Sequence, residues 1–252
     1  MCNLYHVAPE NSLDSYIRRH LGKVKLPEHY PPKPTVGPFD TGMFMVADAD
    51  GGLVGRLGQW GMIRPGQQER TEFKERPSKK PGGKPVREPM LKNNARIETV
   101  SSSPAFRDAW KNGRRCLIPG LWLQEPNWES GRCVWWQLRR ADALPWMVAG
   151  IWSEWSDPAT GETVPNYAML TFNVNSHPLL GRLHRPEKDR KTGEVLPPNL
   201  QDKRGEAHIE PSSWMAWLHG DVDQAKALLV APPVDLYDQG DATAMDALLL
   251  QA

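Results

Sequence analysis

Cysteine, long apolar runs and net charge are all scarce in this sequence of 252 residues. The 3 cysteines are an odd number, and no two have the spacing of a zinc knuckle, so neither a disulfide framework nor a structural zinc site is expected. No stretch approaches the roughly 20 apolar residues of a membrane span, and the first residues lack the basic-then-apolar order of a signal peptide. We therefore expect a cytoplasmic protein without a membrane partner.

The charge is nearly balanced but unevenly distributed. A formal net charge of +1 argues against a general polyanion binder. Residues 64–92, however, hold 9 Lys and Arg against 4 Glu, and residues 232–252 hold 4 Asp and no Lys or Arg. Local basic stripes matter more than the total charge for nucleic-acid binding. On charge alone, a solvated loop is the simpler interpretation of the basic segment.

The pattern of apolar residues predicts many short strands and a few short helices. Apolar runs punctuated by glycine predict strands over 43–48 and 53–63, and four more in close succession over 114–124, 132–140, 144–152 and 166–174. Helices are expected over 11–20, where Asn11 or Ser12 would be the cap, over 104–113, ending at Gly113, and over 212–220 and 221–229. Most of the 11 tryptophans should lie in the core.

These elements predict an α+β fold: a single domain around an antiparallel, barrel-like β-sheet with peripheral short helices. We assign the domain to residues 2–230, with polar insertions near 64–92 and 187–206. Residues 231–252 are assigned to an acidic C-terminal tail, which we expect to be loosely held, as terminal segments usually are. We expect a monomer.

Four polar residues beside apolar segments are candidates for chemistry. Cys2 directly follows Met1, Asn94 follows the basic segment, Glu125 lies at the end of an apolar strand, and His184 precedes the second polar insertion. Taken singly, each has an ordinary structural explanation, such as a surface carboxylate for Glu125 or a solvated loop residue for His184.

Together, these residues belong to a set of ordered motifs. The segments MCNLY, WGMIRP at 60–65, NNARIET at 93–99, RRCLIPGLWLQE at 114–125 and RLHRP at 182–186 follow one another in the order and approximate spacing of the SRAP family. The members of this family are SOS response-associated peptidase-like proteins that act on abasic sites in single-stranded DNA. The sequence resembles the family from Cys2 to about Leu218. It departs from the family pattern at Asn3, at GLWLQ and in the long insertion that follows RLHRP.

The resemblance implies a set of site residues and roles. The implied catalytic residues are Cys2 as nucleophile, Glu125 as general acid and base, His184 as a proton donor and acceptor at the sugar hydroxyl, and Asn94 as a hydrogen-bond donor. The implied DNA-binding residues are Arg96 and Arg185, which would contact phosphates, and Trp60 with Gly61, which would shape the DNA-binding face. No metal and no cofactor are expected. The implied partner is single-stranded DNA containing abasic sites. When bound to DNA, the protein would be associated with the nucleoid.

The chemistry implied at Cys2 requires that Met1 is removed, by the protein's own peptidase activity or by an aminopeptidase. The free α-amine of Cys2 would attack the aldehyde of an abasic site to give an imine. The thiol on the adjacent carbon would then close a five-membered thiazolidine and so form a covalent DNA–protein crosslink. An abasic-site lyase activity, in which His184 assists elimination of the 3′ phosphate, is a further expectation within the DNA damage response.

Three alternatives remain open from the residues themselves. An amidohydrolase with an N-terminal nucleophile would use the Cys2 thiolate, with its own amine as base. A non-catalytic module that binds single-stranded DNA would leave Cys2 incidental. Metal-dependent hydrolysis has the least support, because the 7 histidines are scattered and His177 and His184 share only a loop.

Overall fold

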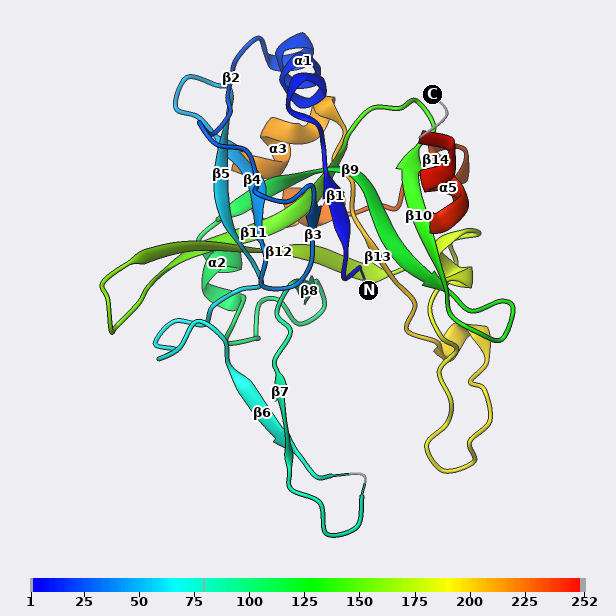
Figure 1. Ribbon diagram of the computed structural model, residues 1–252. Coiled ribbons are helices and arrows are strands. Elements are labelled where there is room, and N and C mark those ends of the chain that lie inside the picture. The colour runs from blue at the N-terminus through cyan, green and yellow to red at the C-terminus, as the bar shows by residue number, and fades with distance from the viewer. Residues whose placement is uncertain (1, 79, 250–252) are drawn as a thin grey trace.

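A closed barrel of five strands forms the centre of the molecule (Figure 1). The computed structural model describes residues 2–78 and 80–249. Around the barrel the order is β9 (Arg115–Asn127), β4 (Thr41–Ala47), β5 (Leu53–Trp60), β12 (Thr163–Asn173) and β11 (Trp146–Ser156), which pairs with β9 again. All neighbours are antiparallel except β5 and β12, which run parallel at Gln59 and Trp60. The predicted α+β fold around a barrel-like, mainly antiparallel sheet is therefore confirmed.

Shorter strands extend the barrel and carry the polar residues of interest. Strand β1 (Tyr5–Val7) pairs with β9 and with β3 (Thr35–Val36), while β2 (Val24–Lys25) runs beside β5. Strands β8 (Asn94–Arg96) and β13 (Arg204–Glu206) both pair with β12. Strand β10 (Val134–Arg140) lies between β9 and β14 (Tyr237–Asp241). The N-terminal residues, β8, β9 and β13 thus meet at one end of the barrel (Figure 1).

The helices lie at the periphery (Figure 1). They are α1 (Glu10–Leu21), α2 (Arg107–Lys111), α3 (Trp214–His219), α4 (Val222–Ala227) and α5 (Ala242–Leu249), with short 3-10 turns at Leu180–Arg182, Pro198–Leu200, Pro211–Ser213 and Val234–Leu236. Helix α1 buries Leu13, Tyr16 and Ile17 at helical spacing. The predicted cap at Asn11 or Ser12 is wrong, because the chain enters this helix from Pro9, whose side chain has no atom that can accept a capping hydrogen bond. No helix in the described ranges is long and apolar enough to cross a membrane.

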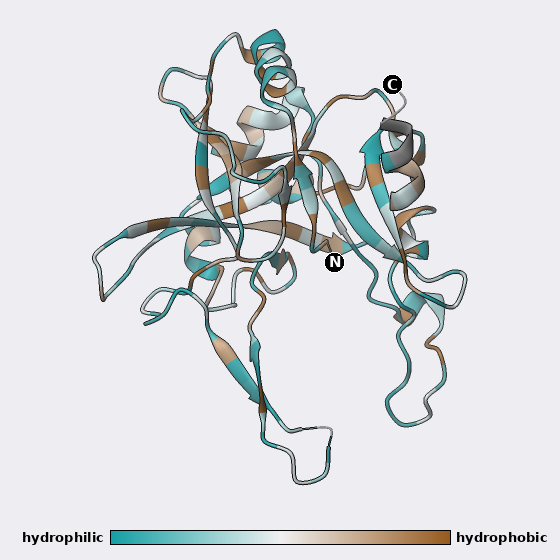
Figure 2. Ribbon diagram, in the orientation of Figure 1, coloured by the Kyte–Doolittle hydropathy of each residue, from teal (hydrophilic) through white to brown (hydrophobic). Residues whose placement is uncertain are grey.

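Aromatic side chains fill much of the core. Trp60, Trp146, Trp214 and Trp217 are completely buried, and Trp110, Trp122 and Trp155 nearly so. Most tryptophans therefore belong to the core, as predicted. Figure 2 shows the hydrophobic residues concentrated on the central strands, whereas the projecting loops are mainly hydrophilic.

The polar segments are more ordered than the sequence suggests. Within residues 64–92, β6 (Phe73–Arg76) and β7 (Val86–Pro89) pair as a two-stranded ribbon that projects from the barrel (Figure 1). Residues 204–206, expected at the end of the second insertion, form β13 within the main sheet. In the acidic C-terminal segment, β14 pairs along β10 and buries Tyr237, so residues 237–241 are not a loosely held tail. The order of β13 and of β14 has the same cause, since long-range strand pairing holds segments that look polar locally within the main sheet.

Candidate functional site

Cys2 is completely buried where β8, β9 and β13 meet. Its Sγ donates a hydrogen bond to the Leu4 carbonyl oxygen at 3.2 Å. Its own carbonyl oxygen accepts hydrogen bonds from the side-chain amides of Asn94 at 2.7 Å and Asn93 at 3.4 Å. Its backbone N–H donates to Glu206 Oε1 at 3.3 Å. The nitrogen, the thiol and the carbonyl of Cys2 are thus each held by a named partner.

Two buried carboxyl groups lie beside the Cys2 side chain. The exposed fractions of Glu125 and Glu206 are only 1% and 2%. Their carboxylate oxygens and Cys2 Sγ all lie within 4.8 Å of one another, and the two carboxyl groups are hydrogen-bonded. Burial raises the pKa of Glu125. Burial, together with the charge of Glu125, raises the pKa of Glu206 to about 8. Near neutral pH the pair therefore retains a proton.

The same environment keeps the Cys2 thiol protonated. Burial raises the pKa of the thiol well above its usual value, and the charges of Glu206 and Glu125 raise it further. A thiolate is the form that attacks amides and binds metals. One sulfur and two carboxylate oxygens are donor types that metals use, but ligands must be deprotonated to bind them. The protonated thiol and the proton retained by the carboxyl pair thus disfavour metal binding near neutral pH.

His184 lies on the other side of Glu125. Its Nε2 is 3.4 Å from Glu125 Oε2 and donates a hydrogen bond to the Arg204 carbonyl oxygen at 2.8 Å, which places the proton of the neutral ring on Nε2. Burial lowers the pKa of His184 to about 4, so the ring is neutral at pH 7. The backbone of His184 has a φ of 65°, and its N–H donates to the Pro126 carbonyl at 2.7 Å. These contacts fix the imidazole against the end of β9.

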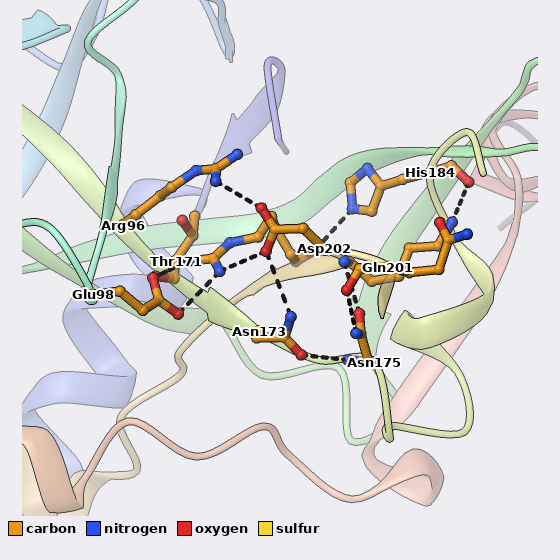
Figure 3. A network of polar contacts seen from close by, with 10 residues as sticks. Arg96, Glu98, Thr171, Asn173, Asn175, His184, Gln201 and Asp202 are labelled. Carbon is orange, nitrogen blue, oxygen red and sulfur yellow. Dashed lines mark hydrogen bonds and ion pairs between the residues drawn. The ribbon is translucent and has the colours of Figure 1, made fainter. Parts of the chain in front are cut away.

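A network of ion pairs joins β8 and β13 next to the site (Figure 3). The buried Arg204 donates to both Glu98 oxygens at 3.0 and 2.6 Å and to Asp202 Oδ1 at 3.0 Å. Arg96 donates to the other Asp202 oxygen at 2.6 Å. Because Arg204 belongs to β13, this network holds both the neighbouring Glu206 and the carbonyl oxygen that binds His184. Arg96 lies on β8 two residues after Asn94, and its charge is shared with Asp202.

The predicted DNA-binding residues differ in accessibility. Trp60 is completely buried and packs edge-on against Tyr5, with 5.1 Å between ring centroids, so its side chain offers no surface for base stacking. Gly61 has a φ of 140° and donates its N–H to the Tyr167 carbonyl at 2.8 Å. Any contribution of this segment to a DNA-binding face is thus through the shape of the backbone. Arg185 is exposed, and its guanidinium lies 5.1 Å from the centroid of the Trp128 ring.

The structure brings Cys2, Asn94, Glu125 and His184 together in one site, although they are far apart in the sequence. Sequence reasoning missed Glu206, because it treated residues 187–206 as a polar insertion. The signal for it was weak: Glu206 precedes a short run in which Ala207 and Ile209 are both buried.

Comparison with known proteins agrees with this geometry. Residues 1–242 match the family model described as SOS response associated peptidase (SRAP). A protein of known structure from Bordetella bronchiseptica is 25% identical, with a TM-score of 0.72 over 96% of this chain and 99% of the other. A protein from Bacteroides thetaiotaomicron is 16% identical, with a TM-score of 0.64 over 95% of this chain and 91% of the other.

A phage-related protein, also from Bordetella bronchiseptica, is 16% identical, with a TM-score of 0.58 over 96% of this chain and 94% of the other. The two more distant structures support the fold alone. No curated protein matches the sequence. The family model, in contrast, spans nearly the whole chain, from the segment that carries Cys2 to the end of β14. The chain therefore belongs to the SOS response associated peptidase family, whose members are associated with abasic-site processing in the SOS response.

Proposed function

We propose that this protein recognises abasic sites in single-stranded DNA and becomes covalently linked to them through Cys2 once Met1 has been removed. The observation that carries the proposal is the placement of Cys2. Its nitrogen and thiol both lie among the buried proton donors and acceptors of Glu125, Glu206 and His184. An aldehyde is the electrophile that an adjacent amine and thiol capture together, since the second nucleophile closes a five-membered ring.

The protonation states suit this sequence of steps. A neutral amine attacks the aldehyde first, and an ordinary α-amine has a pKa near 8. The thiol, whose raised pKa keeps its proton at neutral pH, is held back until an imine has formed. It then loses its proton to a neighbouring carboxylate as the sulfur–carbon bond forms. This order favours the thiazolidine over direct attack by a thiolate.

Glu125, His184 and Asn94 would have distinct roles. Glu125 lies between the Cys2 thiol and His184, where it can protonate the sugar oxygen and receive a proton from the thiol. The neutral His184 would exchange a proton with the ring-opened sugar hydroxyl, and the same group would assist elimination of the 3′ phosphate as a lyase side reaction. Asn94 would orient Cys2 by its hydrogen bond to the carbonyl oxygen.

The exposed surroundings of the site suit a polyanion. Arg185, stacked on Trp128, and the basic ribbon formed by β6 and β7 would contact phosphates and bases. Arg96, although paired with Asp202, would add a phosphate contact from the other side. Binding through these residues would weaken with rising salt concentration.

The amidohydrolase alternative fits the site less well. Such an enzyme needs a thiolate near neutral pH, whereas burial keeps the Cys2 thiol protonated. The side-chain amides of Asn93 and Asn94 point to the carbonyl of Cys2 itself and do not form an oxyanion hole for a second substrate. Removal of Met1 would be a single self-directed reaction at the same residues.

The test is a crosslinking assay on a denaturing gel. Wild-type protein and the variants Cys2→Ala, Cys2→Ser and Cys133→Ala are incubated with single-stranded DNA that carries one abasic site, after intact mass has confirmed loss of Met1. Cys133 is an exposed cysteine and serves as the matched control. We expect a heat-stable shifted band with wild type and Cys133→Ala only. Cys2→Ser should form an imine that is trapped only after borohydride reduction.

A stable band with Cys2→Ala would refute the assignment of the nucleophile. Absence of a band with wild type, despite loss of Met1, would refute crosslinking itself. Binding of intact and abasic DNA with equal affinity would then favour the non-catalytic DNA-binding module.

A further inference from the structure

Glu206 is the carboxyl group that contacts the Cys2 nitrogen, and the family motifs did not point to it. Its Oε1 lies 3.3 Å from that nitrogen and accepts its N–H. Strand pairing holds Glu206 opposite Thr171 on β12. The two basic residues that precede it in the chain are engaged elsewhere. Arg204 binds Glu98 and Asp202, and the Lys203 ammonium donates to the carbonyls of Leu183 and His184.

A buried carboxyl pair of this kind is costly for the fold. Moving a carboxyl group out of water without a cation destabilises the folded state by several kcal/mol. The titratable groups that face Glu206 are the N-terminal amine, the Cys2 thiol, Glu125 on β9, His184 and Tyr237 on β14. The N-terminal amine is a cation whose own proton can move to Glu206, and its charge lowers the pKa of Glu206; the other groups are neutral or acidic, and His184 is neutral at pH 7. The arrangement is therefore suited to exchanging a proton and poorly suited to forming a stable ion pair.

We propose that Glu206 is the base that removes the proton from the Cys2 amine, and that Glu206 and Glu125 act as a carboxyl pair that passes protons between this nitrogen, the sugar oxygen and the thiol. The proposal rests on the proposed function, of which it assigns the proton transfers. It separates two roles: Glu206 acts at the nitrogen, whereas Glu125 acts at the oxygen and the sulfur.

The steps balance without any additional reactant. The hydrogen-bonded pair shares one proton, and in the reacting form this proton lies on Glu125 and leaves Glu206 as the carboxylate. The ammonium of Cys2 gives a proton to Glu206, and the nitrogen lone pair forms a bond to the aldehyde carbon while the carbonyl π pair moves to oxygen. That oxygen takes the proton of Glu125, and the nitrogen then returns a proton to the carboxyl pair. The hydroxyl takes this proton and leaves as water, which gives the iminium. Finally the thiol proton passes to Glu125 as the sulfur–carbon bond forms, and the C=N π pair returns to nitrogen.

The first transfer is favourable because of burial. It converts a buried ammonium and a carboxylate into a neutral amine and a neutral acid, which need less solvation. The raised pKa of Glu206, about 8, is close to that of an ordinary α-amine, so the proton moves between groups of similar basicity. A carboxylate with an ordinary pKa near 4.3 would take up this proton far less readily.

The experiment compares wild type with Glu206→Gln, in which the amide oxygen can still accept the Cys2 N–H but cannot take its proton. Glu154→Gln is the matched control, because Glu154 is a half-exposed glutamate that pairs with Arg56 on the barrel wall. Intact mass confirms loss of Met1 in all proteins, and thermal unfolding confirms folding. Single-turnover rates are measured from pH 6 to pH 9 with abasic single-stranded DNA, and in parallel with formaldehyde, whose thiazolidine adduct is read by intact mass.

We expect Glu206→Gln to react roughly ten- to a hundredfold more slowly than wild type at pH 6 with either aldehyde. The difference should shrink towards pH 9, where the amine has lost its proton without a base. Glu154→Gln should follow wild type throughout. No difference at pH 6, or a loss of the same size at every pH, would overturn the proposal, since a structural role does not depend on pH in this way.

A second variant covers the case in which Glu206→Gln does not fold. Glu206→Asp keeps an acid one methylene further from the nitrogen, so it should react more slowly than wild type but with the same pH profile. A profile like that expected for Glu206→Gln would refute the proposal. The formaldehyde arm separates the two hypotheses: a pH-dependent loss there, with no crosslink to abasic DNA in wild type, would retain the role of Glu206 and refute the proposed function.

Discussion

Raising the pH from about 6.5 to about 8 should destabilise this protein, because the folded state holds a proton on the Glu125–Glu206 pair that the unfolded chain does not. Burial raises the pKa of Glu206 to about 8 in the folded state, whereas an unfolded glutamate has a pKa near 4.3. Between these values the folded state binds more protons than the unfolded state. The free energy of unfolding therefore falls as the pH rises.

The pH range in which the carboxyl pair dominates the change in stability is narrower than the interval between the unfolded and the folded pKa of Glu206. Burial lowers the pKa of His184 to about 4 and that of His208 to about 3, so both rings are neutral in the folded state and become protonated on unfolding below about pH 6.5. That effect destabilises the fold as the pH falls and opposes the contribution of Glu206. From about pH 6.5 to about pH 8 the carboxyl pair is the main contributor, because the buried thiols, whose pKa values are also raised, have unfolded pKa values above this range. About one and a half pH units at about 1.4 kcal/mol per unit give a loss of roughly 2 kcal/mol.

Urea unfolding followed by tryptophan fluorescence measures this loss. Wild type, Glu206→Gln and the control Glu154→Gln are compared at pH 6.5 and pH 8, with the midpoint and the slope of each transition recorded. We expect wild type and the control to lose roughly 2 kcal/mol, and Glu206→Gln to lose less than half of that. An equal loss in wild type and Glu206→Gln would show that the carboxyl pair holds no additional proton in the folded protein at pH 6.5, and that burial does not raise its pKa as inferred.

Three other changes test separate parts of the structure. Asn94→Ala removes the 2.7 Å hydrogen bond to the Cys2 carbonyl and should slow crosslinking roughly three- to tenfold in the gel assay without changing the circular dichroism spectrum; an unchanged rate would contradict its orienting role. Gly42→Ala would place a Cβ against the hydroxyls of both Tyr167 and Tyr5 inside the barrel and should cost about 1–3 kcal/mol in thermal unfolding; an unchanged melting temperature would show that the two rings move aside freely. Trp128→Ala removes an aromatic surface at the rim and should weaken binding of single-stranded DNA roughly tenfold at constant salt in a filter assay, while formaldehyde still reacts at the wild-type rate.

The strands of the barrel were predictable because their local patterns are strong. Strand β9 is almost continuously buried over Arg115–Leu123, and β11 and β12 carry long apolar runs, so periodicity alone identifies them. Closure of the barrel was not predictable in the same way. It depends on pairing between β9 and β11 and on the parallel contact of β5 with β12, which join segments about 100 residues apart in the second case.

The residues of the site divide in the same way, into those that a local pattern predicts and those that only long-range pairing places. The ordered motifs identified Cys2, Asn94, Glu125 and His184, because each lies in a segment with its own recognisable residues. Glu206 lies on a strand of three residues whose burial comes only from its register with Thr171–Asn173. For Trp60 a motif was recognised but did not predict the environment of the side chain. The motif suggested a place at the DNA-binding face, whereas the side chain is completely buried in the core.

The long insertion after RLHRP can vary without moving His184 and Glu206, because its two ends are joined at their base. Gln201 accepts a hydrogen bond from the Glu187 N–H at 2.7 Å and donates to the Glu187 carbonyl at 3.2 Å, which closes the loop. His184 precedes this closure and is held by Pro126 and Arg204, while Glu206 follows it on β13. A loop closed in this way adds little constraint as it lengthens, since the entropy of closure grows only slowly with length. The departure from the family pattern therefore changes what surrounds the site and leaves the positions of His184 and Glu206 intact.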